Sequence, residues 1–267
     1  MFKLTPLRTW TRAAPSPSVR WTSASSITGC TERRSLNDAP LQTPFASPLY
    51  RLFGGWLQIL SVSMALFSGG AEAAQKRVLA FGDSLTAGFG LPAGDSLPSQ
   101  LKKRLQADGY DVDVINAGVS GDTTATGLAR LDYTLSDGHV DVAILELGAN
   151  DMLRGSPPQE ARANLSKIIE SFQSKGATVI LAAMVSSNNW GQAYRQEFDS
   201  IYPDLAAKYG VTMVPFFMEG IWGEPKLLLG DGLHPNPAGV AKVVTKIAPY
   251  VEKVLASPDA KVQSRAQ

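Results

Sequence analysis

Ser84 is the residue of this sequence whose position best suits covalent chemistry. It follows the apolar run 78–81 and the pair Gly82-Asp83, and a stretch with helical spacing of leucines comes after it. A buried parallel strand has this pattern, and open α/β sheets bind ligands at the carboxyl ends of such strands. A serine there is a candidate nucleophile, which needs a base, an acid that orients the base, and hydrogen-bond donors for an oxyanion.

Only two histidines are available as the base. His139 precedes the apolar run 140–147, which places it at the opposite edge of a parallel sheet from Ser84. His234 lies in a loop rich in glycine and proline before the last expected helix, so it can reach the edge that carries Ser84. By elimination His234 is the predicted base, and Asp231, three residues earlier, is placed to orient its ring. Taken alone, this Asp-Gly and His-Pro segment is also typical of an ordinary turn.

Three hydrogen-bond donors are predicted for the oxyanion. The loop after the run 112–116 contains Gly118, whose lack of a Cβ lets its backbone N–H approach a substrate. The loop after 140–147 contains Asn150, whose side-chain amide can donate, and the backbone N–H of Ser84 is the third donor. Gly118 can also be interpreted as a turn glycine and Asn150 as a helix cap. The prediction rests on several strands that deliver fitting groups to one sheet edge.

Apolar runs alternate with amphipathic stretches from residue 77 onward, which predicts the elements that position these groups. The expected strands are 78–81, 112–116, 140–147, 178–183 and 211–214. The expected helices are 97–108, 123–135, 158–174, 194–209 and 237–255. Repeated strand–helix units with continuously apolar strands indicate one α/β domain, in which helices cover both faces of a parallel sheet.

The composition is that of an ordinary globular protein, with 44% hydrophobic residues, 18% charged residues and a formal net charge of +1. No basic excess indicates nucleic acid as a partner, and no acidic tract indicates disorder. The single cysteine, Cys30, lies outside the patterned region and offers neither an internal disulfide nor a metal framework. We therefore expect core packing to hold the fold together.

The amino-terminal part differs in composition from the rest. Residues 1–48 are rich in Ser, Thr, Pro and Arg without a regular period, which predicts a disordered extension or a translation start nearer residue 49. Residues 49–74 resemble a signal peptide, because an apolar core shorter than the ~20 residues of a membrane helix precedes an Ala-x-Ala site. Cleavage near Ala73 or Ala74 predicts a periplasmic or secreted protein, with an uncleaved anchor as the alternative.

Together these residues resemble the SGNH, or GDSL-type, hydrolases, which are named for Ser, Gly, Asn and His in separate blocks. The blocks occur here in order, each after its own strand: Gly82-Asp83-Ser84-Leu85, the segment centred on Gly118, Gly148-Ala149-Asn150-Asp151 and Asp231-Gly232-Leu233-His234-Pro235. Within the family the sequence is similar to the bacterial periplasmic arylesterase, thioesterase I and lysophospholipase group, also at 116–124, 127–131 and 150–155. We expect the hydrolase domain over 75–257 and a disordered tail at 258–267.

The resemblance implies a three-layer α/β/α sandwich with a flavodoxin-like, five-stranded parallel sheet. It also implies hydrolysis of carboxylic esters and thioesters through an acyl-serine on Ser84, with His234 and Asp231 as the other catalytic residues and without a metal or organic cofactor. The expected partner is a small acyl ester or thioester, such as an aryl ester, acyl-CoA or lysophospholipid. Contact with a membrane is expected only through the signal segment or a lipid substrate.

The loop after the fourth expected strand departs from the family pattern. Many relatives carry prolines there and end in Asn-Tyr-Gly or similar, whereas this sequence reads Met184-Val185-Ser186-Ser187-Asn188-Asn189-Trp190-Gly191. Because serine restricts the backbone less than proline, we expect a looser loop. The predicted substrate-binding residues are Met184, Trp190 and Trp222.

Two classes of alternative function stay open. One is a carbohydrate or peptidoglycan O-acetylesterase of the same family, although apolar residues near the expected cleft favour an acyl chain over a sugar: Met184, Trp190, Phe216, Phe217, Met218, Ile221 and Trp222. The other is a non-catalytic binding module or a nucleotide binder in the same crevice. The filled catalytic positions argue against a non-catalytic binding module. The lack of a Gly-x-Gly-x-x-Gly or Walker pattern after the first strand argues against a nucleotide binder.

Overall fold

A computed structural model describes residues 75–257, in which five parallel strands form one sheet. The strands are β1 (Lys76–Gly82), β2 (Val112–Gly118), β3 (Val142–Glu146), β4 (Thr178–Ala182) and β5 (Thr212–Val214). Their spatial order is β2-β1-β3-β4-β5, so the chain steps from β1 to one edge and then crosses back to the other side of β1. The expectations for 1–74 and 258–267 lie outside the described residues.

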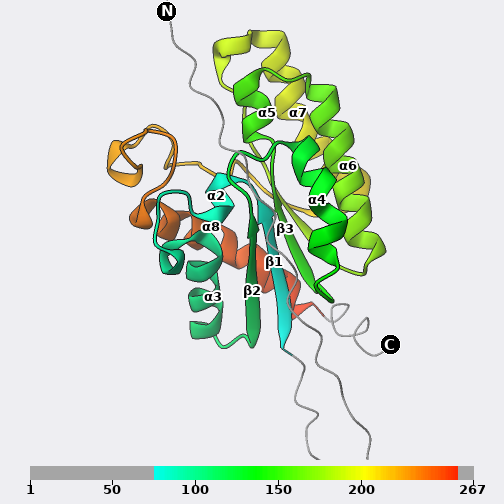
Figure 1. Cartoon of the computed structure of the whole chain (residues 1–267), viewed down its shortest axis with the longest axis vertical. Helices are drawn as coiled ribbons and strands as arrows, with labels where there is room; N and C mark the ends of the chain where they lie inside the picture. Colours follow the sequence, from blue (N-terminus) through cyan, green and yellow to red (C-terminus); the bar gives the residue numbers. More distant parts are fainter. Residues whose placement is uncertain (1–74, 258–267) are drawn as a thin grey trace, which may run out of the picture. The chain divides into compact units, whose positions relative to one another are not determined.

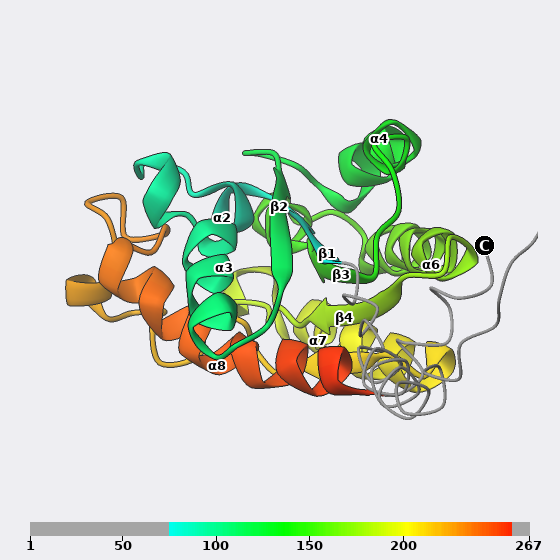
Figure 2. The same ribbon diagram turned by 90° about the horizontal axis from the view of Figure 1, so that it is seen from below.

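Helices cover both faces of the sheet, as Figure 1 shows and the end-on view in Figure 2 makes clear. On one face α3 (Leu97–Ala107) packs against α8 (Pro237–Ala256). On the other face lie α4 (Thr124–Leu135), α6 (Pro158–Ser174) and α7 (Gln192–Tyr209), with α6 in contact with both of the others. The predicted three-layer α/β/α fold is confirmed, and the five predicted helices end within two residues of their expected bounds.

Two helices at the carboxyl ends of the strands are too short for a hydrophobic period to show in the sequence. α2 (Ser84–Ala87) follows β1, and α5 (Ala149–Arg154) follows β3. Single 3-10 turns complete the loops at Ala93–Asp95, Asn188–Trp190 and Pro225–Leu227. These short elements form the rim of the sheet on which the candidate site lies.

The core lies between the sheet and its two helical layers. All of β3 is buried, and Phe81 on β1 meets Phe172 on α6 edge-to-face, with ring centroids 5.6 Å apart. α8 begins directly after Asn236. The side chain of Asn236 accepts hydrogen bonds from two backbone N–H groups in the first turn of the helix. This cap determines where the loop that contains His234 ends. Among the described residues, no helix combines the length and hydropathy needed to cross a membrane.

Candidate active site

Ser84, His234 and Asp231 form one hydrogen-bonded chain at the carboxyl edge of the sheet. The Oγ atom of Ser84 lies 2.9 Å from Nε2 of His234, and Nδ1 of His234 lies 2.6 Å from Oδ2 of Asp231. Ser84 begins α2 directly after β1, whereas the other two residues come from the loop before α8. The structure thus brings together the three side chains chosen from the sequence, in the arrangement of a nucleophile, its base and an orienting acid.

Backbone N–H groups of the loop before α8 hold the side chain of Asp231 in place. Oδ1 accepts hydrogen bonds from the backbone N–H groups of Leu233 at 2.9 Å and His234 at 3.0 Å, which leaves Oδ2 for the imidazole. The bond from Leu233, followed by those from His234, lowers the pKa of Asp231 to about 2. An ionised Asp231 favours the tautomer with the proton on Nδ1, so that Nε2 can accept the proton of Ser84.

Phe89 covers one side of the base, a contact not expected from the sequence. Its ring centroid lies 4.5 Å from that of His234, with the rings tilted by 36°. Its backbone N–H donates to the carbonyl oxygen of Ser84 at 3.1 Å. Phe89 follows the glycine that ends α2, and the only signal in the sequence was an aromatic residue between two glycines.

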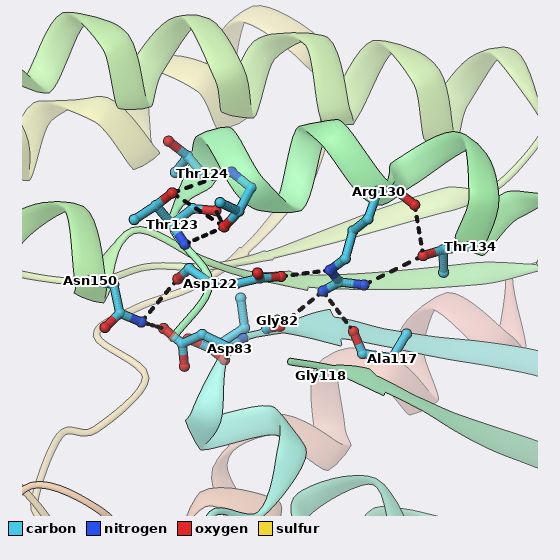
Figure 3. A network of polar contacts seen from close by, with 12 residues as sticks. Gly82, Asp83, Ala117, Gly118, Asp122, Thr123, Thr124, Arg130, Thr134 and Asn150 are labelled. Atoms are coloured by element: carbon cyan, nitrogen blue, oxygen red, sulfur yellow. Dashed lines mark hydrogen bonds and ion pairs between the residues drawn. The ribbon is translucent and has the colours of Figure 1, made fainter. Parts of the chain in front are cut away.

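Asn150 lies in α5, and its amide faces the ends of β1 and β2 (Figure 3). Nδ2 donates to Oδ2 of Asp83 at 3.1 Å and to the backbone oxygen of Asp122 at 2.9 Å. The next residue, Asp151, accepts from the backbone N–H and the hydroxyl of Thr124 at 2.8 and 2.7 Å, which joins α5 to the start of α4. Both amide hydrogens of Asn150 have acceptors, so an oxyanion must share or replace the longer bond to Asp83.

Gly118 does not have the position expected of an oxyanion donor, and this prediction is corrected. Its backbone N–H donates to Oδ1 of Asn116 at 3.0 Å. A Cβ at Gly118 would lie 2.3 Å from the backbone nitrogen of Ala87, so glycine is needed there because the end of β2 packs tightly on α2. Gly121, in the loop after β2, lines the cleft with a φ of +87°, and among the described residues its N–H has no hydrogen-bond partner.

Two buried carboxyl groups lie beneath Ser84. Oδ1 of Asp83 accepts from the backbone N–H of Leu85 at 3.0 Å and thereby caps α2. Oε2 of Glu146 accepts from the hydroxyl of Thr86 at 2.7 Å and from the N–H of Asp83 at 3.3 Å, while Oε1 has no partner among the described residues. Burial raises the pKa of Asp83 to about 6 and the pKa of Glu146 well above its ordinary range. This burial favours the protonated form of Glu146, which supports the turn through its contacts with Thr86 and Asp83.

A cleft of about 410 Å³ opens onto Ser84 and His234. Its walls are mainly apolar and come from segments that follow different strands: Phe89, Met152, Leu153, Met184, Val185, Phe216, Met218, Trp222 and Leu233. Met184 and Trp222 were predicted to bind substrate, and both line this cleft. Such a volume and lining are typical of sites for small apolar ligands.

Trp190 does not line the cleft, which corrects the third substrate-binding prediction. Its indole N–H donates to the backbone oxygen of Met152 at 2.8 Å. Its ring lies so close to Gly155 that a Cβ there would be 2.8 Å from the indole. The backbone N–H of Ser186 also donates to Oδ1 of Asp199 at 2.7 Å. The loop after β4 is thus anchored at both ends, despite the serines that predicted a looser segment.

The remaining polar candidates lie elsewhere. His139 is at the opposite edge of the sheet, where its Nε2 lies 3.7 Å from Oδ1 of Asp141. Across residues 75–257, no group of three or more His, Cys, Asp or Glu side chains is arranged to hold a metal ion.

Comparison with known proteins agrees with this site. The sequence model described as the GDSL-like Lipase/Acylhydrolase family matches residues 80–242. An arylesterase from Vibrio mimicus is 39% identical over 199 residues, which cover 74% of this chain and 100% of the relative. The thioesterase 1/protease 1/lysophospholipase L1 of Escherichia coli K12 is 37% identical over 164 residues, which cover 61% of this chain and 77% of the relative.

A solved structure shows the same likeness in three dimensions. The crystal structure of AlinE4, an SGNH-hydrolase family esterase, is 45% identical in sequence, with a TM-score of 0.58 over 68% of this chain and 98% of that chain. Fold, site and relatives together define an enzyme that hydrolyses ester bonds on an SGNH scaffold. The chain belongs to the GDSL-like lipase/acylhydrolase family.

Proposed function

We propose that this protein hydrolyses carboxylic esters and thioesters through an acyl-enzyme intermediate on Ser84. The observation that carries the proposal is the continuous chain from Ser84 through His234 to Asp231, with spacings of 2.9 and 2.6 Å. His234 accepts the hydroxyl proton as Oγ attacks the carbonyl carbon, and then donates that proton to the leaving alcohol or thiol. Water attacks the acyl group in the same way, which releases the acid and restores Ser84.

Three donors stabilise the oxyanion in this proposal: the backbone N–H groups of Ser84 and Gly121, and the side-chain amide of Asn150. All three residues line the cleft, and the two N–H groups have no hydrogen-bond partner among the described residues. Gly121 replaces Gly118 in this role because the N–H of Gly118 is already bonded. Loss of one such donor typically costs about 2.7–4 kcal/mol of transition-state stabilisation.

The apolar cleft supports an acyl chain as the part of the substrate that is recognised. The similarity to an arylesterase and to a thioesterase and lysophospholipase adds support for aryl and alkyl esters, acyl-CoA and lysophospholipids as substrates. The signal-peptide pattern at 49–74 supports a site of action in the periplasm or outside the cell.

An O-acetylesterase acting on carbohydrate is the second candidate, because Trp222 at the cleft is 50% exposed and aromatic rings of this kind can stack on sugars. The two candidates differ in their preferred acyl group and leaving group. A higher kcat/KM for medium-chain nitrophenyl esters than for acetylated xylan supports the proposed function, and the reverse order supports the carbohydrate esterase.

Labelling with a fluorophosphonate, followed by intact-mass measurement, tests the acyl-serine step. We expect one adduct on the wild type and none on Ser84→Ala, with cooperative thermal unfolding preserved. Ser120→Ala is the matched control, since it removes a second serine hydroxyl from the same cleft and should still be labelled. Wild-type turnover by a folded Ser84→Ala variant would overturn the proposal.

A further inference from the structure

Arg130 projects from α4 toward the carboxyl ends of β1 and β2 (Figure 3) and does not line the cleft. Nη2 donates to the backbone oxygens of Gly82 at 3.1 Å and Ala117 at 2.9 Å, and Nε donates to Oδ2 of Asp122 at 2.5 Å. The guanidinium also stacks 4.0 Å from the ring centroid of Phe81. The side chains of Arg130 and Asp122 are 21% and 8% exposed, so this ion pair is largely shielded from water.

Each group that Arg130 holds is next to one part of the oxyanion site. Gly82 ends β1 two residues before Ser84, and Ala117 lies in β2 just before the loop that contains Gly121. Asp122 follows Gly121 directly, and its backbone oxygen accepts the amide of Asn150 at 2.9 Å. The groups that Arg130 holds therefore lie within two residues or one hydrogen bond of all three proposed donors.

We propose that Arg130 is the positioning residue of the oxyanion site, which sets the spacing between the N–H groups of Ser84 and Gly121 and the amide of Asn150. This inference rests on the proposed function, because it assigns Arg130 a role only in a reaction that develops an oxyanion. Arg130 does not line the cleft, so it acts through the groups it holds and not on the substrate.

The chemistry of arginine suits this task better than that of lysine. Its planar fork presents several N–H donors in fixed directions, and here Nε and Nη2 reach three different acceptors. A lysine ammonium has the charge but not the fixed geometry. The pairing also neutralises the Asp122 carboxylate next to the loop of Gly121, where an unpaired negative charge would oppose a developing oxyanion.

A misplaced donor affects the transition state more than the ground state, which gives the test its readout. For Arg130→Ala and Arg130→Lys we expect kcat on a nitrophenyl ester to fall about 10–100-fold, the cost of displacing reacting groups by about 1 Å. KM should stay within about two-fold. The affinity for a trifluoromethyl ketone, which mimics the tetrahedral intermediate, should fall in parallel with kcat, while the affinity for the product acid should not.

Arg162 provides the matched control for a merely structural arginine. It also forms a fork, to Oδ2 of Asp204 and to the hydroxyl of Ser200, each at 2.8 Å, but it joins α6 to α7 away from the cleft. We expect Arg162→Ala to lower the melting temperature and leave kcat within about two-fold. An equal loss of kcat in both arginine variants would overturn the positioning role.

Chemical rescue separates position from stability. Arg130 borders a second surface groove of about 390 Å³, which is also lined by Ala117 and Thr134 and shares no lining residue with the cleft. Added methylguanidinium should enter this groove and restore part of kcat in Arg130→Ala, whereas methylammonium should not.

If Arg130→Ala does not fold, Asp122→Asn carries the test, because it keeps the backbone oxygen that holds Asn150 and removes the charge that holds Arg130.

The outcomes distinguish this inference from the proposed function. A wild type that is not labelled by fluorophosphonate contradicts the acyl-serine mechanism itself. A wild type that is labelled, together with folded Arg130 variants that have wild-type kcat and wild-type affinity for the ketone, contradicts only the role of Arg130. Loss of kcat with unchanged KM, weaker binding of the ketone and rescue by methylguanidinium supports both.

Discussion

The two halves of the active site are built in different ways. The base half is local, because Asp231 and His234 lie in one loop and the carboxylate is held by backbone N–H groups of Leu233 and His234. Little outside this loop is needed to orient the imidazole. Its geometry depends mainly on a turn of a few residues and on where α8 begins.

The oxyanion half is distributed over the ends of three strands. Asn150 follows β3, yet its amide is held by Asp83 after β1 and by Asp122 after β2. Arg130 then reaches the same strand ends from α4. We therefore expect changes in the base half to have little effect on folding, and changes in the oxyanion half to affect activity and stability together.

His234→Ala should give the largest effect and test the local half. We expect kcat to fall about 10⁶-fold, as when a catalytic histidine is removed from a serine protease, and about 10⁴-fold for Asp231→Ala. For His234→Ala the free energy of unfolding should change by about 1 kcal/mol or less, because Asp231 still accepts the backbone N–H groups that hold the loop. Ester-hydrolysis assays measure kcat, and urea denaturation of the same preparations measures the free energy of unfolding. A large loss of stability would show that the base half is not local.

Asn150→Ala should lower both activity and stability. We expect kcat to fall about 10²–10³-fold through loss of an oxyanion donor. We expect the free energy of unfolding to fall by about 1–3 kcal/mol, because Asp83 and the oxygen of Asp122 lose a buried donor. Asn164→Ala is the matched control, since its amide donates to the hydroxyl of Thr124 outside the cleft and its loss should affect stability only.

The same contrast explains what could be predicted from sequence. The strands and long helices have clear apolar periods, and the Asp-x-x-His spacing of the base half lies in a single loop, so both could be identified. Gly118 and Gly121 are only three residues apart, and only the backbone fold shows that the N–H of Gly118 is bonded and that Gly121 lines the cleft. Glu146 ends an apolar strand, where nothing in the pattern distinguishes a buried carboxyl group from an exposed one.

Glu146→Gln tests whether the carboxyl group beneath Ser84 is neutral. Its pKa in the folded protein is raised above the unfolded value, so its contribution to stability is complete below the unfolded pKa and is lost as pH rises through the folded pKa. Glutamine cannot lose a proton, so the free energy of unfolding of the variant should rise relative to that of the wild type as pH rises.

Urea denaturation at several pH values between 5 and 9 measures this difference, with Glu160→Gln as the control that removes an exposed carboxyl group from α6. A wild-type curve parallel to that of Glu146→Gln over this range would mean that Glu146 is ionised in the folded state as it is in the unfolded state. The distributed half would then contain a permanently ionised carboxylate, and the neutral-acid interpretation would be wrong.

Trp190→Phe should give the smallest effect. It tests whether the contact between Trp190 and Met152, outside the cleft, influences the substrate preference of the cleft. The variant keeps an aromatic ring but removes one of the two donors to the oxygen of Met152, which retains the backbone N–H of Gly155 at 3.1 Å, and this should cost about 1 kcal/mol of stability. Because Met152 and Leu153 line the cleft, the ratio of kcat/KM between long and short acyl esters should change by about ten-fold or less.

Trp222→Phe sharpens this last test, because Trp222 lines the cleft directly and its indole makes no hydrogen bond within the described part of the chain. It should alter the same ratio without loss of stability. If both tryptophan variants change selectivity and only Trp190→Phe also melts earlier, then acyl preference depends on the anchored loop as well as on the cleft wall. If Trp190→Phe leaves the ratio unchanged, the loop after β4 is only structural, and selectivity belongs to the residues that touch the acyl chain.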